Sequence, residues 1–154
     1  MFKTILFCTD FSENSHYAFT YALHLAKTNR SKLLILHVLP EIVFPEQLSI
    51  YLPSDKLDEF RASQKKMLDQ DMKTHYLQKM EGFDNFQILL KQGEPSQEII
   101  RTAKKESADL IVMGTHGRTG LDHIIFGSTA ERVVRKSPSP VMTIRLPGKE
   151  FDML

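Results

Sequence analysis

Five short apolar runs, separated by longer segments with helical periodicity, most restrict how this chain of 154 residues can fold. The runs cover residues 3–8, 32–38, 86–91, 109–113 and 141–145. Each is short, largely aliphatic and bounded by polar residues or glycine, which is typical of strands buried on both faces. Strands that alternate with helices of this length pair in parallel. The sequence therefore predicts a single α/β domain: a doubly wound, Rossmann-like, five-stranded parallel sheet.

Four helices are expected between these strands. The first follows Ser12, which is placed to cap it, and ends near residue 28; the others cover about 54–81, 95–106 and 128–136. The segment Ser128-Thr-Ala-Glu131 has the form of a capping box. In the long second helix, one apolar stripe is predicted to face the core: Leu57, Phe60, Met67, Leu68, Met72, Tyr76 and Met80.

Two segments have no predicted helix or strand. Residues 39–53 contain three prolines and no periodicity, and a loop of that length is usually functional, for example as a lid. Residues 148–154 form a short C-terminal tail after a domain of residues 1–147. A chain of this size has enough residues to bury a core without disulfides.

Composition restricts the environment and the class of partner. Cys8 is the only cysteine, so no internal disulfide can form, and a reducing compartment is expected. The first ten residues do not have the pattern of a signal peptide, and no apolar run has the ~18 residues of a membrane span. The formal net charge is +1, so no global field favours nucleic acid or membrane. We therefore expect a cytoplasmic protein that binds any anion locally.

Such a local anion site is predicted between residues 114 and 128, where four of the seven glycines occur. The segment leaves a buried strand and enters a helix. Glycines allow a ligand to approach the backbone, and a helix N-terminus presents free N–H groups and a positive dipole end. This arrangement favours phosphate, although the glycines would also suit a loop that only makes tight turns. The two common phosphate motifs, Gly-x4-Gly-Lys-Ser/Thr and Gly-x-Gly-x-x-Gly, are both absent.

The spacing Gly114-x2-Gly117-x9-Gly127-Ser128 resembles the nucleotide-binding signature of the universal stress protein family. ATP-binding members of that family carry Gly-x2-Gly-x9-Gly-Ser/Thr between the fourth strand and the last helix. The resemblance covers nearly the whole chain and includes Thr-Asp-Phe-Ser at 9–12, Leu-His-Val at 36–38 and Val-Met-Gly at 112–114. It implies the sheet order 3-2-1-4-5, with a nucleotide cleft between the ends of strands one and four.

The same resemblance assigns residues to an adenine nucleotide, ATP or AMP. Thr9, Asp10 and Val38 would contact adenine and ribose, and Cys8 would lie at the adenine edge, where family members often have proline. The residues that would line the ribose and phosphates are Met113, Gly114, Gly117, Gly127, Ser128 and Thr129. His116 and Arg118 can also reach phosphate oxygens from the loop.

Several of these residues have a purely structural alternative. Asp10 can help to cap the first helix, Val38 can be ordinary core, and Arg118 can be a solvated turn residue. Cys8 can be a redox-sensitive thiol, but a buried apolar role is favoured. The histidines show no metal-ligand spacing, so Mg²⁺ is expected only as a companion of bound phosphates.

As a function, we expect a stress-response binding module that holds ATP or AMP. The alternative is a slow ATPase or nucleotidyl-transfer enzyme on the same fold, although no phosphate-gripping lysine or nucleophile–base pair is visible. An RNA-binding role is disfavoured because Gly114-Thr-His-Gly117 follows a strand, whereas the Gly-x-x-Gly clamp of KH domains joins two helices. The family implies a homodimer through the last strand, Val141–Arg145, whose free edge would otherwise remain an open template for pairing.

Overall fold

The computed structural model of the chain describes residues 1–40, 54–116 and 127–147. Most of the 39–53 segment and the 148–154 tail lie outside these ranges, so the lid, the tail and the domain boundary stay predictions. In chain order the elements are β1 (Thr4–Thr9), α1 (Glu13–Asn29), β2 (Lys32–Leu39), α3 (Ser54–His75), the 3-10 helix η1 (Leu77–Met80), β3 (Phe86–Gln92), α4 (Pro95–Lys105), β4 (Leu110–Gly114), α5 (Ser128–Lys136) and β5 (Val141–Ile144).

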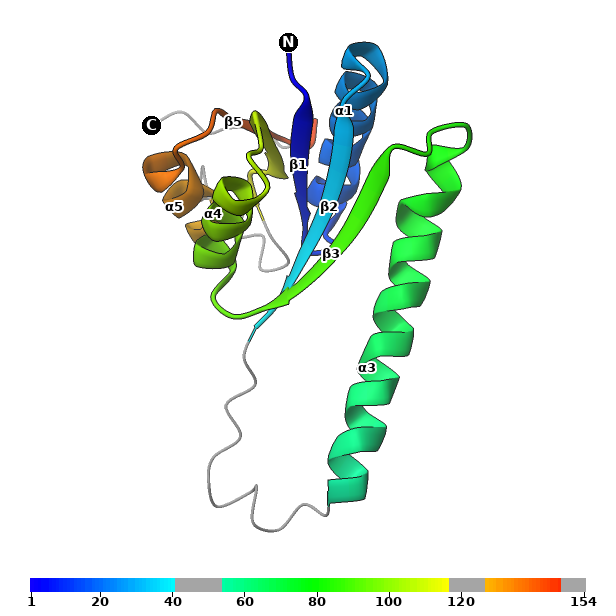
Figure 1. Cartoon of the computed structure of the whole chain (residues 1–154). Coiled ribbons are helices and arrows are strands. Elements are labelled where there is room, and N and C mark those ends of the chain that lie inside the picture. Colours follow the sequence, from blue (N-terminus) through cyan, green and yellow to red (C-terminus); the bar gives the residue numbers. More distant parts are fainter. Residues whose placement is uncertain (41–53, 117–126, 148–154) are drawn as a thin grey trace.

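The strands of the described ranges form one parallel sheet with the order β3-β2-β1-β4-β5. Helices α1 and α3 lie on one face of this sheet, and α4 and α5 lie on the other (Figure 1). The predicted fold class and sheet order are therefore confirmed. The connections after β1 and before β4 lie on opposite faces, so the winding of the sheet reverses between these two strands.

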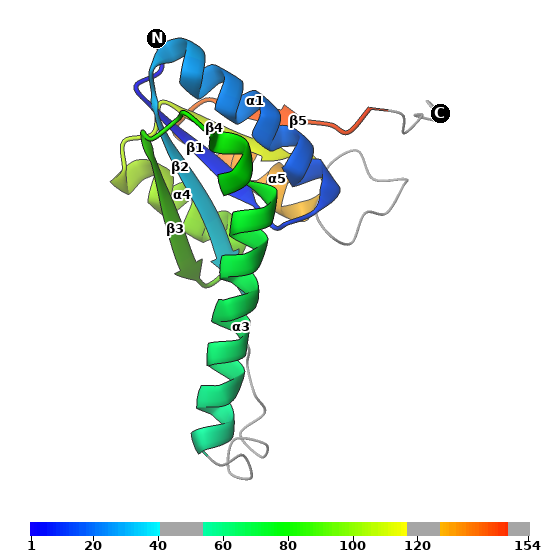
Figure 2. The ribbon, with the colours of Figure 1, turned by 90° about the vertical axis from the view of Figure 1, so that its right-hand side faces the viewer.

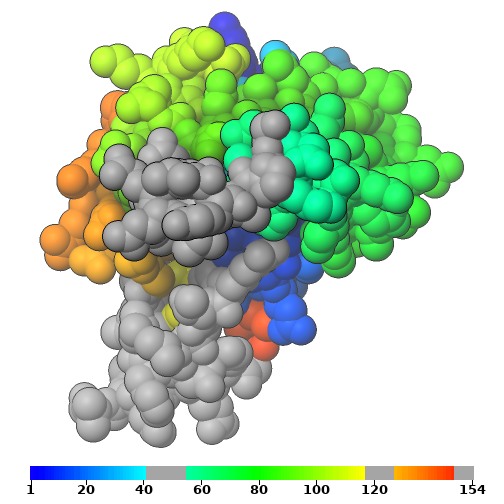
Figure 3. All heavy atoms as spheres, turned by 90° about the horizontal axis from the view of Figure 1, so that it is seen from below, coloured from blue at the N-terminus to red at the C-terminus, as the bar shows by residue number. Residues whose placement is uncertain are grey.

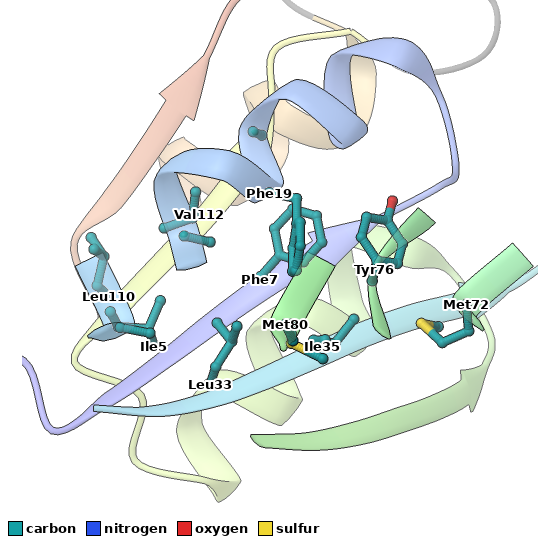
Figure 4. Packing of buried hydrophobic residues seen from close by; sticks show 13 residues of the cluster. Ile5, Phe7, Phe19, Leu33, Ile35, Met72, Tyr76, Met80, Leu110 and Val112 are labelled. Carbon is teal, nitrogen blue, oxygen red and sulfur yellow. The ribbon is translucent and has the colours of Figure 1, made fainter. Parts of the chain in front are cut away.

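The central strands are apolar throughout because both of their faces are covered. Ile5 and Phe7 of β1 point into the core under α1 and α3, whereas Leu6 and Cys8 belong to the core under α4 and α5. In the first core, Phe7, Phe19 and Tyr76 pack with ring centroids 4.7–5.5 Å apart (Figure 4). All three are fully buried, so the α1 and α3 layer is fixed to β1 mainly by aromatic packing.

The first helix begins as its sequence predicts. Ser12 is the N-cap residue, and its hydroxyl accepts a hydrogen bond from the Ser15 amide at 3.2 Å. This satisfies one of the amides that the first turn of a helix leaves without a partner. The cap fixes the position at which the chain turns from β1 into α1.

The second predicted helix differs from the sequence interpretation in two ways. It ends at His75 rather than near residue 81, because Tyr76 leaves the helical conformation at φ −125° and η1 then winds more tightly. Its N-terminal part extends beyond the sheet (Figures 1 and 2), so Phe60 and Met67 are 45% and 64% exposed within the described residues. Only the C-terminal end of the predicted stripe, with Met72, Tyr76 and Met80, is buried in the core.

The difference between the packed part of the helical layer and the extended part of α3 can be measured by replacing one phenylalanine in each with alanine. Replacing the fully buried Phe19 with alanine should lower the free energy of unfolding by about 3–5 kcal/mol, because it removes a large side chain and leaves a cavity. Phe60→Ala, on the extended part of α3, should change it by less than about 1 kcal/mol. Urea denaturation measures both, and equal losses at the two positions would contradict the packing described here.

Candidate functional site

The candidate site lies at the carboxyl ends of β1 and β4. In open α/β sheets, ligands bind at this edge where the winding of the sheet reverses. The register places Cys8 of β1 beside Met113 of β4, so Thr9 and Gly114 end neighbouring strands. Figure 3 views this end of the molecule, with residues of the β1–α1 region in blue and those of α5 in orange.

The two ends of the glycine-rich segment lie together at this edge. The Gly127 amide donates a hydrogen bond to the Thr115 carbonyl at 2.8 Å, and the Thr115 amide donates to the Ile144 carbonyl at 2.9 Å. These bonds hold the chain that leaves β4 next to the start of α5. Gly117 and Arg118, which the sequence assigned to the phosphates, lie outside the described residues.

Gly114 is required for the packing of α1 against β4. A Cβ atom added at this position would lie 3.0 Å from both the carbonyl carbon and the Cβ of Asn14, in the first turn of α1. Real Cβ atoms rarely approach backbone that closely, so the helix packs here because residue 114 has no side chain. The first glycine of the motif therefore sets the distance between α1 and β4.

The start of α5 corrects one expectation. Gly127 is the N-cap residue, without a side-chain cap, and Ser128 is already inside the helix, so the predicted capping box is wrong. Glu131 forms an ion pair with Arg135 at 3.2 Å, and its amide donates to the Gly127 carbonyl at 3.0 Å. Because the helix begins one residue early, the side chains of Ser128 and Thr129 project from its first turn. The positive end of the helix dipole points toward the candidate site.

Cys8, Val38 and Met113 form part of one apolar cluster on the α4 and α5 face. Their exposed fractions are 6%, 9% and 6%, so each is largely packed within the protein. Burial raises the pKa of the Cys8 thiol, which therefore keeps its proton. This environment favours the apolar role for Cys8 over a reactive thiolate.

Thr9 and Asp10 are held by hydrogen bonds within the turn after β1. The Thr9 hydroxyl contacts Phe11 N at 2.9 Å, Ser15 Oγ at 3.1 Å and the Tyr76 hydroxyl. One carboxylate oxygen of Asp10 accepts a hydrogen bond from the Ser12 amide at 3.0 Å. Asp10 thus contributes to the turn that precedes α1, as its structural alternative proposed.

Sequence reasoning missed a group of rings around this turn. His16 of α1 stacks on His75 of α3 with ring centroids 3.9 Å apart, and Phe11 packs against His37 at 4.7 Å. His37 is buried and donates through Nδ1 to the Thr9 carbonyl at 2.8 Å, because a carbonyl can only accept. The Leu-His-Val pattern at 36–38 was the only local signal, since the other contacts join residues far apart in the sequence.

The model of the universal stress protein family matches residues 1–145 of the chain. The chain belongs to the universal stress protein family. Universal stress protein MJ0577 of Methanocaldococcus jannaschii is 31% identical to it over 160 residues, with 94% of this chain and 96% of that relative covered. Universal stress protein YxiE of Bacillus subtilis is 33% identical over 148 residues, with 94% of this chain and 100% of that relative covered.

Solved structures of universal stress proteins show the same fold. The structure of MJ0577 has a TM-score of 0.80 at 26% identity and covers 96% of this chain and 99% of that one. A universal stress protein in complex with cAMP has a TM-score of 0.59, and one from Archaeoglobus fulgidus in complex with dAMP has a TM-score of 0.60. These two are 21% identical to this chain and cover 97% and 94% of it, with 98% of each of their own chains covered. At that identity they establish a shared fold.

The described part of this universal stress protein contains neither a metal-binding cluster nor a membrane-spanning helix. No three His, Cys, Asp or Glu side chains among those residues lie where they could share a metal ion. No helix within the same ranges has both the length and the apolar composition that crossing a membrane requires.

The buried face of His16 predicts a pH dependence of stability. Burial lowers the pKa of His16, and the nearby charges of His75 and Lys79 lower it further, against Asp10 and Asp71, which raise it. Because the pKa is lower in the folded than in the unfolded chain, protonation favours unfolding. Stability should be fully present above the ordinary histidine pKa of about 6.5 and should fall as the pH decreases below it.

Urea denaturation between pH 7.5 and pH 5.5 measures this effect. His16→Gln should reduce the loss of stability on acidification, because it removes the titrating ring. His24→Gln, on the exposed side of the same helix, provides the control and should leave the loss unchanged. An identical pH dependence in wild type and His16→Gln would show that His16 does not contribute.

Proposed function

We propose that this universal stress protein binds an adenine nucleotide, ATP or AMP, at the carboxyl edge of its sheet. The observation that carries the proposal is the Thr115–Gly127 backbone hydrogen bond, which joins the two halves of the glycine motif beside the end of β1. Apolar residues, a carboxylate and a helix N-terminus are thereby gathered at one edge, which is the composition expected of a nucleotide site. Support also comes from the family members of the same fold in complex with cAMP and dAMP.

Each part of the site suits one part of the nucleotide. Cys8, Val38 and Met113, which are 6–9% exposed, would supply an apolar wall for adenine, with Thr9 shaping the adjoining turn. A carboxylate such as that of Asp10 is a natural acceptor for ribose hydroxyls. The phosphates would lie against backbone and side chains of the motif: Gly114, His116, Gly117, Arg118, Gly127, Ser128 and Thr129. Any Mg²⁺ would be held largely by the phosphates, as is usual for this ion.

We propose a cytoplasmic binding module rather than an enzyme. A helix N-terminus and backbone amides can hold phosphates, but hydrolysis also needs an oriented water or base and a cation at the transferring phosphoryl group. Among residues 114–116 and 127–128, the described part of the loop, His116 has the ionisable side chain. Its Nδ1 lies 2.9 Å from the Thr115 hydroxyl. A slow ATPase remains the alternative function on the same site.

Ligand-induced stabilisation separates these functions. A ligand at a hundredfold excess over its Kd should stabilise the folded state by about 2.7 kcal/mol, which for a domain of this size raises Tm by roughly 5–10 °C. We expect this shift with ATP or AMP, together with little or no phosphate release. Thermal denaturation and a phosphate assay measure the two effects. The binding proposal fails if ATP, ADP and AMP all leave Tm unchanged, and turnover near ~10 s⁻¹ would favour the enzyme.

We also propose that the protein is a homodimer through β5 and Arg145. β5 is an edge strand of the described sheet, and all four of its residues are only partly buried in the single chain. Pairing across a two-fold axis would cover this edge and bring Val141 and Thr143 of both copies close together.

Light scattering should therefore give twice the chain mass of 17.7 kDa at tens of micromolar protein. Thr143→Lys should shift the mass toward the monomer, because the two-fold axis would bring two positive charges together. Thr28→Lys, on an exposed position of α1, is the matched control and should remain dimeric. A monomeric wild-type mass would overturn the assembly without affecting the nucleotide proposal.

A further inference from the structure

The turn that carries Asp10 has a conformation that needs outside support. Phe11 has φ +59°, in the left-handed region that residues other than glycine, asparagine and aspartate rarely adopt. The amide of the next residue, Ser12, donates a hydrogen bond to the Asp10 carboxylate at 3.0 Å. The direction of the Asp10 side chain is therefore tied to the strained backbone at Phe11, and whatever holds Phe11 also positions Asp10.

Hydrogen-bond donors and acceptors around Thr9 can be assigned by counting protons. The Ser15 hydroxyl donates to the Ser12 carbonyl at 2.8 Å, so it can accept from the Thr9 hydroxyl at 3.1 Å. Having donated its one proton, Thr9 Oγ1 accepts from the Phe11 amide at 2.9 Å and must also accept from the Tyr76 hydroxyl. The chain of donors thus begins at Tyr76 and ends at the N-cap of α1.

Tyr76 is suited to begin this chain because it cannot move easily. Its side chain is fully buried, and its ring packs on Phe7 and Phe19, with the hydroxyl directed away from these rings (Figure 4). Burial raises the pKa of Tyr76 to about 12, so the hydroxyl keeps the proton that it donates. The ring also lies 5.8 Å from that of Phe11.

We infer that Tyr76 is a positioning residue for nucleotide binding, because its hydroxyl fixes Thr9 and thereby the strained turn that presents Asp10. This inference rests on the proposed function. It assigns a role to the junction of α3 and η1, which is distant in sequence from every residue of the glycine motif. Tyr76 acts through the turn and makes no contact with the nucleotide itself.

A double-mutant cycle tests the inference by titration calorimetry with ATP. Tyr76→Phe keeps the ring and removes the hydroxyl, and it should weaken ATP binding about tenfold. In an Asp10→Ala background the same change should weaken binding by less than about twofold, because the residue that Tyr76 positions is then absent. Tyr21→Phe is the control, since it also removes a hydroxyl with a hydrogen bond, to Tyr17 at 3.1 Å, on the exposed face of α1; its affinity should equal that of wild type.

A purely structural hydroxyl would give a different pattern. Tyr76→Phe would then bind ATP like wild type, or would lose the same factor in both backgrounds, and either result overturns the inference. Ser15→Ala breaks the donor chain at its other end and should show the same dependence on Asp10, so it replaces Tyr76→Phe if that variant does not fold. If wild type itself binds neither ATP, ADP nor AMP, the proposed function fails instead.

Discussion

The central strand β1 is buried on both faces, and the other elements are placed by the need to cover it. Phe7 faces the aromatic core under α1 and α3, and Leu6 and Cys8 face the core under α4 and α5. A strand covered in this way exposes backbone only at its ends. Because the winding reverses between β1 and β4, the carboxyl ends of these strands are not covered by a crossover helix, and the candidate site lies there.

The glycines of the motif have two structural roles, one in helix packing and one at the start of α5. Gly114 allows α1 to approach β4, since a Cβ would lie 3.0 Å from the Asn14 backbone. Gly127 begins α5 and, through its bond to the Thr115 carbonyl, returns the segment to the strand end. A glycine needed for packing cannot by itself indicate a ligand. Phosphate binding at this loop is instead favoured by the helix N-terminus and by the juxtaposition of the two loop ends.

The strands and their parallel pairing could be predicted from the sequence, because they depend on local apolar runs. A short motif indicates a candidate site at the strand ends, and that assignment stays a prediction. The errors arose where distant residues decide the local structure. Tyr76 leaves the helix and bonds to Thr9, 67 residues earlier, and helical periodicity contains no sign of that contact. Phe60 fits the apolar stripe, but the sheet does not extend far enough to cover it. Ser128 matched a capping box, yet the N-cap is Gly127, one residue before it, and Ser128 is the first residue of the helix.

Nucleotide binding at the β1–β4 edge is tested most directly on the protein as purified and after incubation with ATP. The sample is desalted and denatured, and the released small molecules are identified by mass spectrometry. We predict an adenine nucleotide in an amount comparable to the protein, and much less from a Gly117→Val variant, whose branched side chain would block approach to the backbone. Release of no nucleotide from either wild-type sample, or equal release from the variant, would contradict a phosphate site at this loop.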